Sequence, residues 1–370
     1  MSRVPTMTDR TEALPIKIRP RLDAKPWGGR RLETWGIALP PHEAIGEALL
    51  TAPEAIVASG ARQGVTLGEL ARQDPATWVG AGGLAVTGGR PLFPLLIKLI
   101  DGHADLSVQV HPDDRAAAAA GLGTGKTEAY YVLAADPGSI IYLGLEPGAD
   151  PAAFATACRR ADGSAVRFLR RIPAKPDMTV LIPAGTPHAL GAGIVLYEIQ
   201  QPSNVTFRLD DWGRRDADGV GRQLHHAEGL ALVDPLSRPE PILPIVVHDG
   251  AVERRLLVAT RYFALERITS VSRGGVQVAA VESPQVLTCI RGTWVVAASA
   301  TATPLSIGET MILPAGAEAG LAASEPAVVL RGWVPDRERD IAAPARAAGA
   351  SAKLIRGLAG TPRDTAEGRA

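Results

Sequence analysis

Cysteine, net charge and long apolar runs are scarce or missing in this 370-residue chain, and each shortage excludes a class of protein. Its two cysteines, Cys158 and Cys289, are too few for a disulfide scaffold, so we expect buried, unpaired thiols in a reducing compartment. The 39 basic residues balance the 39 acidic ones, which removes the electrostatic footprint of proteins that bind nucleic acid or anionic membranes.

Targeting and nucleotide-binding signals are also missing. The first twenty residues lack the apolar core of a signal peptide, and no run approaches the roughly 18 apolar residues of a membrane span. No GxGxxG follows a candidate strand, and no GxxxxGKS or GxxxxGKT occurs. We therefore expect a cytoplasmic protein with no nucleic-acid or membrane partner. The sequence is silent on its oligomeric state.

Turn residues are abundant. Thirty prolines and 39 glycines separate short segments rich in Val, Ile, Leu and Thr, which is typical of a β-sandwich or barrel. Helical patterns are few: residues 66–73 begin with a capping box of Thr66 and Glu69, and residues 150–171 have room for one or two short helices. The sequence predicts a mainly β fold with short helical decorations.

The strand candidates form two blocks, separated by a proline-rich stretch at residues 234–247. An internal sequence repeat supports this division. The segments MTVLIPAGTPHAL at 178–190 and ETMILPAGAEAGL at 309–321 both have a predicted strand followed by PAG. At the matching position the first copy has His188 and the second has Ala319. We expect two barrels of one design, of which only the first retains a ligand.

These observations predict four segments along the chain. They are a flexible N-terminal segment at 1–14, a first barrel with small helical insertions at 15–235, a second, degenerate barrel at 240–335 and a partly ordered tail at 336–370.

Polar side chains line one face of the strand predicted in LSVQVHPDD. Since alternate residues of a strand point to one face, Ser107, Gln109 and His111 project together. Glu128 begins another strand candidate, and His188 follows the PAGTP turn. Imidazoles, a carboxylate and an amide oxygen suit zinc or another borderline divalent ion and leave room for water or substrate. Such a site would stabilise an oxyanion.

Other polar pairs have simpler interpretations. Asp113 and Asp114 precede an alanine-rich run and are expected to cap a short helix that ends near Gly121, rather than bind metal. The adjacent His225 and His226 are expected at a surface turn or a helix start.

Four motifs, in order, give the chain a family resemblance. LSVQVHPDD, KTE at 126–128, IPAGTPHA and EIQQPSNVTFRLDDWGR closely resemble the type I mannose-6-phosphate isomerases (phosphomannose isomerases), zinc enzymes of the cupin superfamily. The likeness covers roughly residues 15–335. It resembles the short bacterial form, because only 60 positions separate Glu128 from His188. The resemblance implies two cupin-type (jelly-roll) barrels, the first of them catalytic.

The resemblance also implies roles for individual residues. One zinc ion per chain would be bound by four residues, another three would be catalytic, and two would meet the substrate phosphate. The zinc ligands would be Gln109, His111, Glu128 and His188. The catalytic residues would be Glu198, Arg208 and Lys126, and the phosphate would be bound by Lys98 and Ser107.

The chemistry needs these residue types. Interconverting mannose 6-phosphate and fructose 6-phosphate moves a proton between two carbons through an enediol or enediolate, which requires a positioned base and a cation. Glu198 and Lys126 both remain candidates for the proton carrier. Arg208 would hold charge on the substrate or intermediate, and Lys98, with Ser107, would meet the phosphate.

The chain departs from the family at two positions near Arg208. Phe207 and Asp210 stand where tyrosines are usual, which leaves two alternatives open. One is an isomerase of a different or unphosphorylated sugar, and the other is a non-catalytic cupin that binds metal and a sugar phosphate. A cupin oxygenase is a third possibility, although such sites usually have more histidines.

Overall fold

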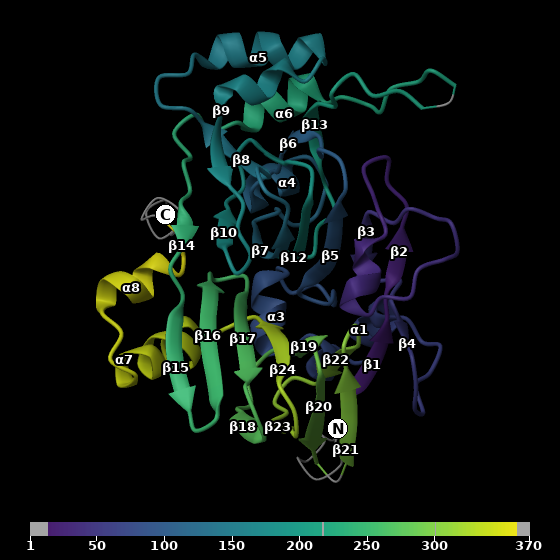
Figure 1. Cartoon of the computed structure of the whole chain (residues 1–370), viewed down its shortest axis with the longest axis vertical. Helices are drawn as coiled ribbons and strands as arrows, with labels where there is room; N and C mark the ends of the chain where they lie inside the picture. The colour runs from purple at the N-terminus through teal and green to yellow at the C-terminus, as the bar shows by residue number, and fades with distance from the viewer. Residues whose placement is uncertain (1–13, 217, 300, 361–370) are drawn as a thin grey trace, which may run out of the picture.

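Four antiparallel sheets dominate the chain in a computed structural model that describes residues 14–216, 218–299 and 301–360. The prediction of a mainly β fold with short helices is confirmed. Figure 1 shows the sheets of the first half of the chain above those of the second half.

Two sheets belong to the first half of the chain. The larger has seven strands, in the order β14 (Pro241–Ile242), β10 (Thr179–Ile182), β7 (Glu128–Ala135), β12 (Ile194–Gln200), β5 (Leu96–Gly102), β3 (Glu47–Leu49) and β2 (Arg21–Asp23). The smaller has five, in the order β13 (Phe207–Asp210), β6 (Val108–Val110), β11 (His188–Leu190), β8 (Ile140–Leu145) and β9 (Leu169–Pro173).

The other two sheets are built mostly from the second half. The eight-stranded sheet has the order β15 (Ile245–Asp249), β16 (Val252–Ala259), β17 (Ala264–Ser270), β24 (Ala327–Trp333), β19 (Gln285–Arg291), β22 (Thr310–Leu313), β1 (Ile16–Arg19) and β4 (Ile56–Val57). The four-stranded sheet has the order β18 (Gly274–Val278), β23 (Ala319–Ala323), β20 (Thr293–Ala298) and β21 (Thr301–Ser306).

Strand β12 explains how the sheets stack. Its alternate residues point to opposite faces. Leu196 packs in an apolar core with Leu143 of the five-stranded sheet, whereas Tyr197 and Ile199 pack in a core with Leu330 of the eight-stranded sheet. All seven residues of β12 are buried, because both of its faces are covered.

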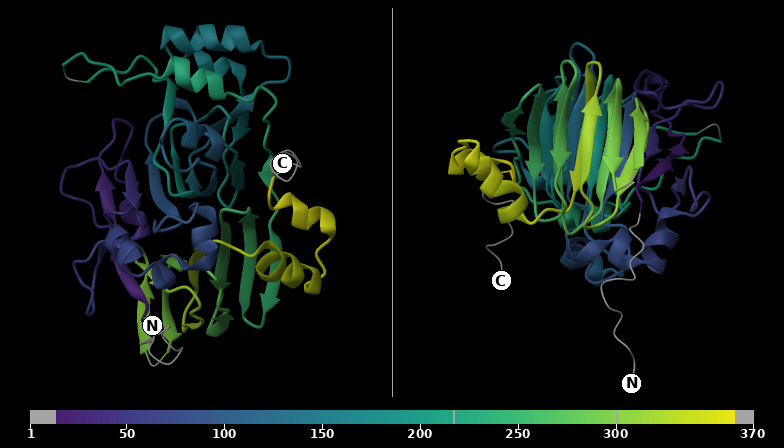
Figure 2. Two further views of the ribbon diagram at one scale, coloured as in Figure 1. Left: turned by 180° about the vertical axis from the view of Figure 1, so that it is seen from behind. Right: turned by 90° about the horizontal axis from the view of Figure 1, so that it is seen from below.

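A separate apolar core lies between the eight-stranded and four-stranded sheets. Each sheet pair thus encloses its own core, as two barrels would, and the two large sheets pack against each other. Figure 2 shows this stacking from behind and from below. The division into two cupin-type barrels stays a prediction.

The first half of the chain is connected to the second at its beginning and at its end. β1 pairs with β22, so an N-terminal strand lies in the eight-stranded sheet, and β14 pairs with β10 before the chain enters β15. The predicted boundaries at 15–235 and 240–335 stay predictions. The predicted flexible segment at 1–14 lies outside the described residues, apart from Leu14.

The helices lie around the sheets (Figure 1). The capping box of Thr66 and Glu69 is present at α1, and Asp113 caps α4 as predicted. The tail forms three short helices up to residue 357, while 361–370 lie outside the described residues. The helices are η1 (Arg31–Trp35), α1 (Leu67–Gln73), α2 (Pro75–Trp78), α3 (Gly80–Val86), α4 (Asp114–Ala119), α5 (Pro151–Arg160), η2 (Ser164–Phe168), α6 (His226–Leu232), η3 (Arg337–Ala342), α7 (Ala343–Ala347) and α8 (Ala352–Gly357).

None of the helices among the described residues is long and apolar enough to cross a membrane. Both cysteines, Cys158 and Cys289, are buried and unpaired, as the sequence predicts.

Candidate active site

The first sheet pair brings the predicted metal ligands to one end of its interior. β6 and β11 are neighbours in the five-stranded sheet, and their register places His188 opposite Gln109. His111 directly follows β6, and Glu128 is the first residue of β7 in the facing seven-stranded sheet. Ligands from both sheets can therefore meet between them.

Three of these side chains form a buried cluster that could hold a metal ion. One donor atom from each of His111, Glu128 and His188 lies within 4.8 Å of the others. Glu128 Oε1 lies 3.1 Å from His188 Nε2, and Glu128 Oε2 lies 3.4 Å from His111 Nε2. All three residues are almost completely buried, which excludes the common case of an exposed acidic group with no ligand.

Hydrogen bonds orient two of the predicted ligands, both of which lie in the five-stranded sheet. His188 Nδ1 lies 2.9 Å from the carbonyl oxygen of Thr186, so this nitrogen donates and Nε2 keeps a free lone pair. The Gln109 amide lies 3.1 Å from His188 Nε2. In the opposite orientation of this amide, its oxygen would lie beside the cluster as a possible ligand.

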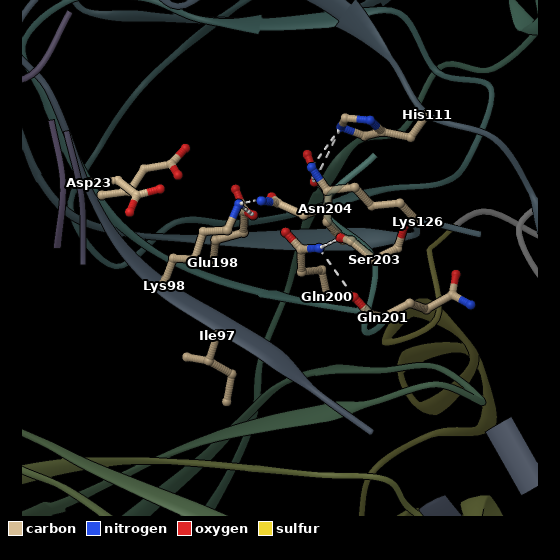
Figure 3. A network of polar contacts seen from close by, with 12 residues as sticks. Asp23, Ile97, Lys98, His111, Lys126, Glu198, Gln200, Gln201, Ser203 and Asn204 are labelled. Carbon is tan, nitrogen blue, oxygen red and sulfur yellow. Dashed lines mark hydrogen bonds and ion pairs between the residues drawn. The ribbon is translucent and has the colours of Figure 1, made fainter. Parts of the chain in front are cut away.

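Two lysines extend the cluster into a charged network (Figure 3). Lys126 Nζ lies 2.9 Å from Glu128 Oε2 and 3.1 Å from His111 Nε2. Lys98 and Glu198 are cross-strand neighbours on β5 and β12, with Nζ and Oε1 3.3 Å apart. Lys98 also donates to Asn204 Oδ1 at 3.3 Å.

Glu47 belongs to this network but was missed in the sequence. It lies on β3, beside β5, and its side chain is 13% exposed, with an oxygen 3.3 Å from Lys25 Nζ. The charges of Lys98 and Lys126 also act on Glu47 and outweigh burial, so the pKa of Glu47 is lowered. Glu47 comes near Lys98 because β3 pairs with β5. The segment GEALL does not by itself indicate that its glutamate belongs to a charged site.

The environment separates the protonation states of these groups. Burial, followed by the Lys126 cation, lowers the pKa of His111 to about 3, so its imidazole is neutral at pH 7. Burial opposes ionisation of Glu128, but the charge of Lys126 outweighs it and holds the pKa of Glu128 well below the usual value. Burial and the Glu128 charge raise the pKa of Glu198, against the attraction of Lys98.

The remaining predicted residues lie beside the cluster without contacting it. Arg208 is opposite Gln109 on β13, and its guanidinium donates to the carbonyl of Gln223 at 2.9 Å. Ser107 is buried two residues before Gln109. Among the described residues, no hydrogen bond or ion pair joins Arg208 or Ser107 to the three-residue cluster.

The donors fit a divalent cation. Glu47, Glu128 and Glu198 supply three carboxylates, and Lys25, Lys98 and Lys126 supply three ammonium groups, so these side chains balance one another in charge. Glu128 Oε1 lies 3.1 Å from the Nε2 lone pair of His188, so two buried acceptor atoms face each other, a costly arrangement that a bound cation would relieve.

Comparisons with known proteins point to one family. The chain is 33% identical over 260 residues to the mannose-6-phosphate isomerase of Streptococcus mutans, covering 68% of this chain and 78% of the relative. It is 32% identical over 259 residues to mannose-6-phosphate isomerase ManA of Bacillus subtilis, with the same coverage. The chain belongs to the mannose-6-phosphate isomerase family.

Solved structures agree with this family. The mannose 6-phosphate isomerase of Bacillus subtilis superposes with a TM-score of 0.74 and 28% identity, covering 86% of this chain and 99% of that chain. A phosphomannose isomerase variant from Salmonella typhimurium, at 17% identity and a TM-score of 0.67, shares the fold. No family model matches the chain.

The two departures from the family pattern lie on the outer face of the five-stranded sheet. Phe207 packs with the apolar cluster beneath α5 and α6, and its ring meets His225 edge-on. The buried Asp210 accepts backbone N–H bonds from Gly163 and Trp212, at 3.0 Å and 2.9 Å. Both side chains serve packing and turn structure, so neither departure alters the wall that faces the cluster.

Proposed function

We propose that this protein is a zinc-dependent aldose–ketose isomerase that interconverts mannose 6-phosphate and fructose 6-phosphate through an enediol or enediolate. One observation carries the proposal: the buried cluster of His111, Glu128 and His188 shares its space with the Lys98–Glu198 pair. Abstraction of a proton next to a carbonyl requires a base and a cation close together. The carboxyl group of Glu198, which is buried and has a raised pKa, lies beside the candidate cation site.

We propose one zinc ion, held by Gln109, His111, Glu128 and His188. Two neutral imidazoles, a carboxylate and an amide oxygen are a donor set that zinc accepts. When bound, the ion supplies positive charge against the substrate oxygen that becomes anionic. Metal analysis of the purified protein tests the identity of the ion.

Glu198 is the better candidate for the proton carrier. Its carboxyl group is buried, with Oε1 3.3 Å from Lys98 Nζ, and its raised pKa makes it a stronger base than an ordinary carboxylate. Lys126, the alternative, has its ammonium group committed to Glu128 and His111. We therefore assign Lys126 to orienting Glu128 and to stabilising negative charge, and its contact with His111 Nε2 would give way to the ion.

Arg208 and Lys98 would hold the anionic substrate. The guanidinium of Arg208 lies beside Gln109 at the edge of the site, where one donor group already reaches Gln223. Lys98 keeps its charge, because Glu198 and Glu47 outweigh burial and raise its pKa. With Ser107, Lys98 would meet the phosphate. A small sugar phosphate is thus the proposed partner, and the unpaired cysteines support a cytoplasmic location.

NMR of mannose 6-phosphate tests the proposal directly. Protein loaded with zinc should produce fructose 6-phosphate and, in heavy water, incorporate deuterium at the exchanging carbon, whereas chelated protein should do neither. Unphosphorylated mannose serves as the control substrate. Turnover of mannose at an equal rate would contradict the phosphate requirement, and no turnover of either sugar by loaded protein would contradict the isomerase function.

A further inference from the structure

Asp114 has four partners around its carboxylate. Its Oδ1 accepts from the backbone N–H of Gly125 and from the side-chain amide of Gln201, both at 2.9 Å. Its Oδ2 accepts from the Tyr262 hydroxyl at 2.6 Å and forms an ion pair with Arg261 at 3.1 Å. Capping of α4 is done by the neighbouring Asp113, so these four contacts are not needed for the helix.

The Oδ1 partners hold the turn that carries Lys126. Gly125 precedes Lys126, whose ammonium group contacts Glu128 and His111. Gln201 holds the other side of the same turn, because its Oε1 accepts from the backbone N–H of Thr127 at 2.9 Å. Asp114 therefore holds the turn directly at Gly125, before Lys126, and indirectly through Gln201 at Thr127, after Lys126.

Gln201 also belongs to a second segment of the site, residues 200–204. This loop ends at Asn204, which accepts from Lys98 (Figure 3), and the Gln200 side chain donates to the carbonyl of Gln201 at 3.1 Å. Through Gln201, the Asp114 carboxylate thus reaches both lysines of the charged network.

The Oδ2 partners come from the other half of the molecule. Arg261 and Tyr262 form the turn between β16 and β17 of the eight-stranded sheet. Thr260 fixes this turn, since its hydroxyl accepts from the backbone N–H groups of Tyr262 and Phe263 at 3.0 Å and 3.1 Å. The Arg261 guanidinium lies 4.5 Å above the Tyr262 ring, which restricts both side chains.

We propose that Asp114, anchored by Arg261 and Tyr262, is a positioning residue that holds the Lys126 turn and the 200–204 loop in place. The inference rests on the proposed isomerase function. It gives the second half of the chain a part in the reaction, although that half supplies none of the predicted ligands. Displacing a catalytic group by 1 Å can cost about 100-fold in rate, so a bond at the backbone next to Lys126 is able to control turnover.

Two variants test the proposal in the full-length, metal-loaded protein: Asp114→Ala and Tyr262→Phe. We expect kcat to fall by about 10-fold to 100-fold in Asp114→Ala and less in Tyr262→Phe, with a smaller change in KM. Amide hydrogen exchange should accelerate at residues 124–128 and 200–204 in both variants. The affinity for zinc, measured by calorimetry, should weaken as the Lys126 turn loosens.

Asp177 provides a matched control. It accepts from the Tyr131 hydroxyl at 2.6 Å and from Arg267 at 2.7 Å, so it forms the same kind of bridge between the two large sheets. Within the described part of the chain, no hydrogen bond or ion pair joins Asp177 to the Lys126 turn. Asp177→Asn should lower Tm without changing kcat or the exchange rate at 124–128.

The outcomes separate the two proposals. If Asp114→Ala and Tyr262→Phe only lower Tm, as Asp177→Asn should, Asp114 is a structural residue and the inference is overturned. If the unaltered protein does not isomerise the sugar phosphate, the proposed function fails, but exchange at 124–128 and zinc affinity still decide whether Asp114 positions the site. If Asp114→Ala does not fold, Tyr262→Phe removes a single hydroxyl and carries the same test.

Discussion

His111 is neutral in the folded protein and would be protonated in the unfolded chain over a wide pH range. Its pKa is about 3 because of burial and the Lys126 cation, compared with 6.5 for an ordinary imidazole. Between these values the unfolded chain binds the extra proton, so acid favours unfolding. The same burial that makes His111 available as a ligand therefore ties stability to pH.

This linkage predicts the pH dependence of the metal-free protein. The contribution of His111 should be complete above 6.5 and decline as the pH falls towards 3, by at most about 1.4 kcal/mol per pH unit. Urea unfolding between about pH 7 and about pH 4 measures it. His111→Gln should show a shallower slope, and equal slopes for both proteins would contradict the prediction.

Substitutions at Glu198 and Lys126 separate proton transfer from ligand orientation. Glu198→Gln should leave zinc affinity nearly unchanged and lower kcat by about 100-fold to 10,000-fold, since it removes the proposed base. Deuterium incorporation from the solvent should disappear with it. Lys126→Met should instead weaken zinc binding as well as turnover, because Lys126 contacts two ligands. Loss of exchange in Lys126→Met alone would assign the proton to the lysine.

Arg208→Ala tests the substrate contact at the edge of the site. The guanidinium is not joined to the cluster among the described residues, so zinc content should stay equal to that of the unaltered protein. Turnover should fall by about 100-fold or more, since a charge-assisted contact to the reacting anion is lost. Zinc loss on this substitution would instead make Arg208 a support for Gln109.

The sequence predicted residues whose role follows from local pattern. Strand alternation grouped Gln109 with His111, and the PAG turn picked out His188. Glu47 and Asp114 could not be found in this way. The contacts of Glu47 depend on β3 lying beside β5, and those of Asp114 on a turn some 150 positions away, which is a pairing that no local periodicity encodes.

At the level of elements, each of the two large sheets carries a cluster of ion pairs. Glu198 on β12 faces Lys98 on β5, and Arg331 on β24 faces Glu266 on β17. Arg254 on the next strand also binds Glu266, with Nε 2.7 Å from Oε1. In the first cluster Glu128 also faces two imidazole nitrogens, which a cation could bridge, whereas in the second both Glu266 oxygens accept from arginines, so the second cluster stabilises the fold rather than a ligand.

Glu266→Gln should therefore destabilise the protein without affecting the site. The substitution leaves the buried Arg331 and the half-buried Arg254 without their counter-charge, which costs about 3–5 kcal/mol. Turnover per folded molecule should not change. Glu253→Gln breaks the more exposed Glu253–Arg255 pair nearby and should cost no more than about 1 kcal/mol. Similar losses of unfolding free energy in both variants would contradict this assignment.

The helices show where local pattern succeeds and fails. A capping box predicted α1, and Asp113 predicted the start of α4. The sequence did not predict α3, because GAGGLAV is rich in glycine, which disfavours helix. Its structure depends on a distant contact: Gly82 donates to the carbonyl of Glu282 at 2.8 Å, and Gly80 has φ +71° where a Cβ would lie 2.3 Å from the same oxygen.

At the scale of the whole molecule, the two halves share one apolar core. Ile97, Tyr197 and Ile199 of the seven-stranded sheet pack in a cluster with Leu257 and Leu330 of the eight-stranded sheet. β1 and β4, from the N-terminal region, complete the eight-stranded sheet. The repeated PAG motif indicated two similar units, but nothing in the sequence indicated that the first unit lends strands to the second.

This shared core predicts that the halves unfold together and cannot be separated. The full chain should show one calorimetric transition. A fragment of residues 1–243 would expose the outer face of the seven-stranded sheet, including Tyr197 and Ile199, and leave β1 without β22. An apolar surface of that kind favours aggregation, so the fragment should lack near-UV circular dichroism and zinc binding. A soluble fragment with dispersed NMR signals that binds zinc would contradict the prediction, because the site would then need neither the shared core nor the Arg261–Tyr262 turn.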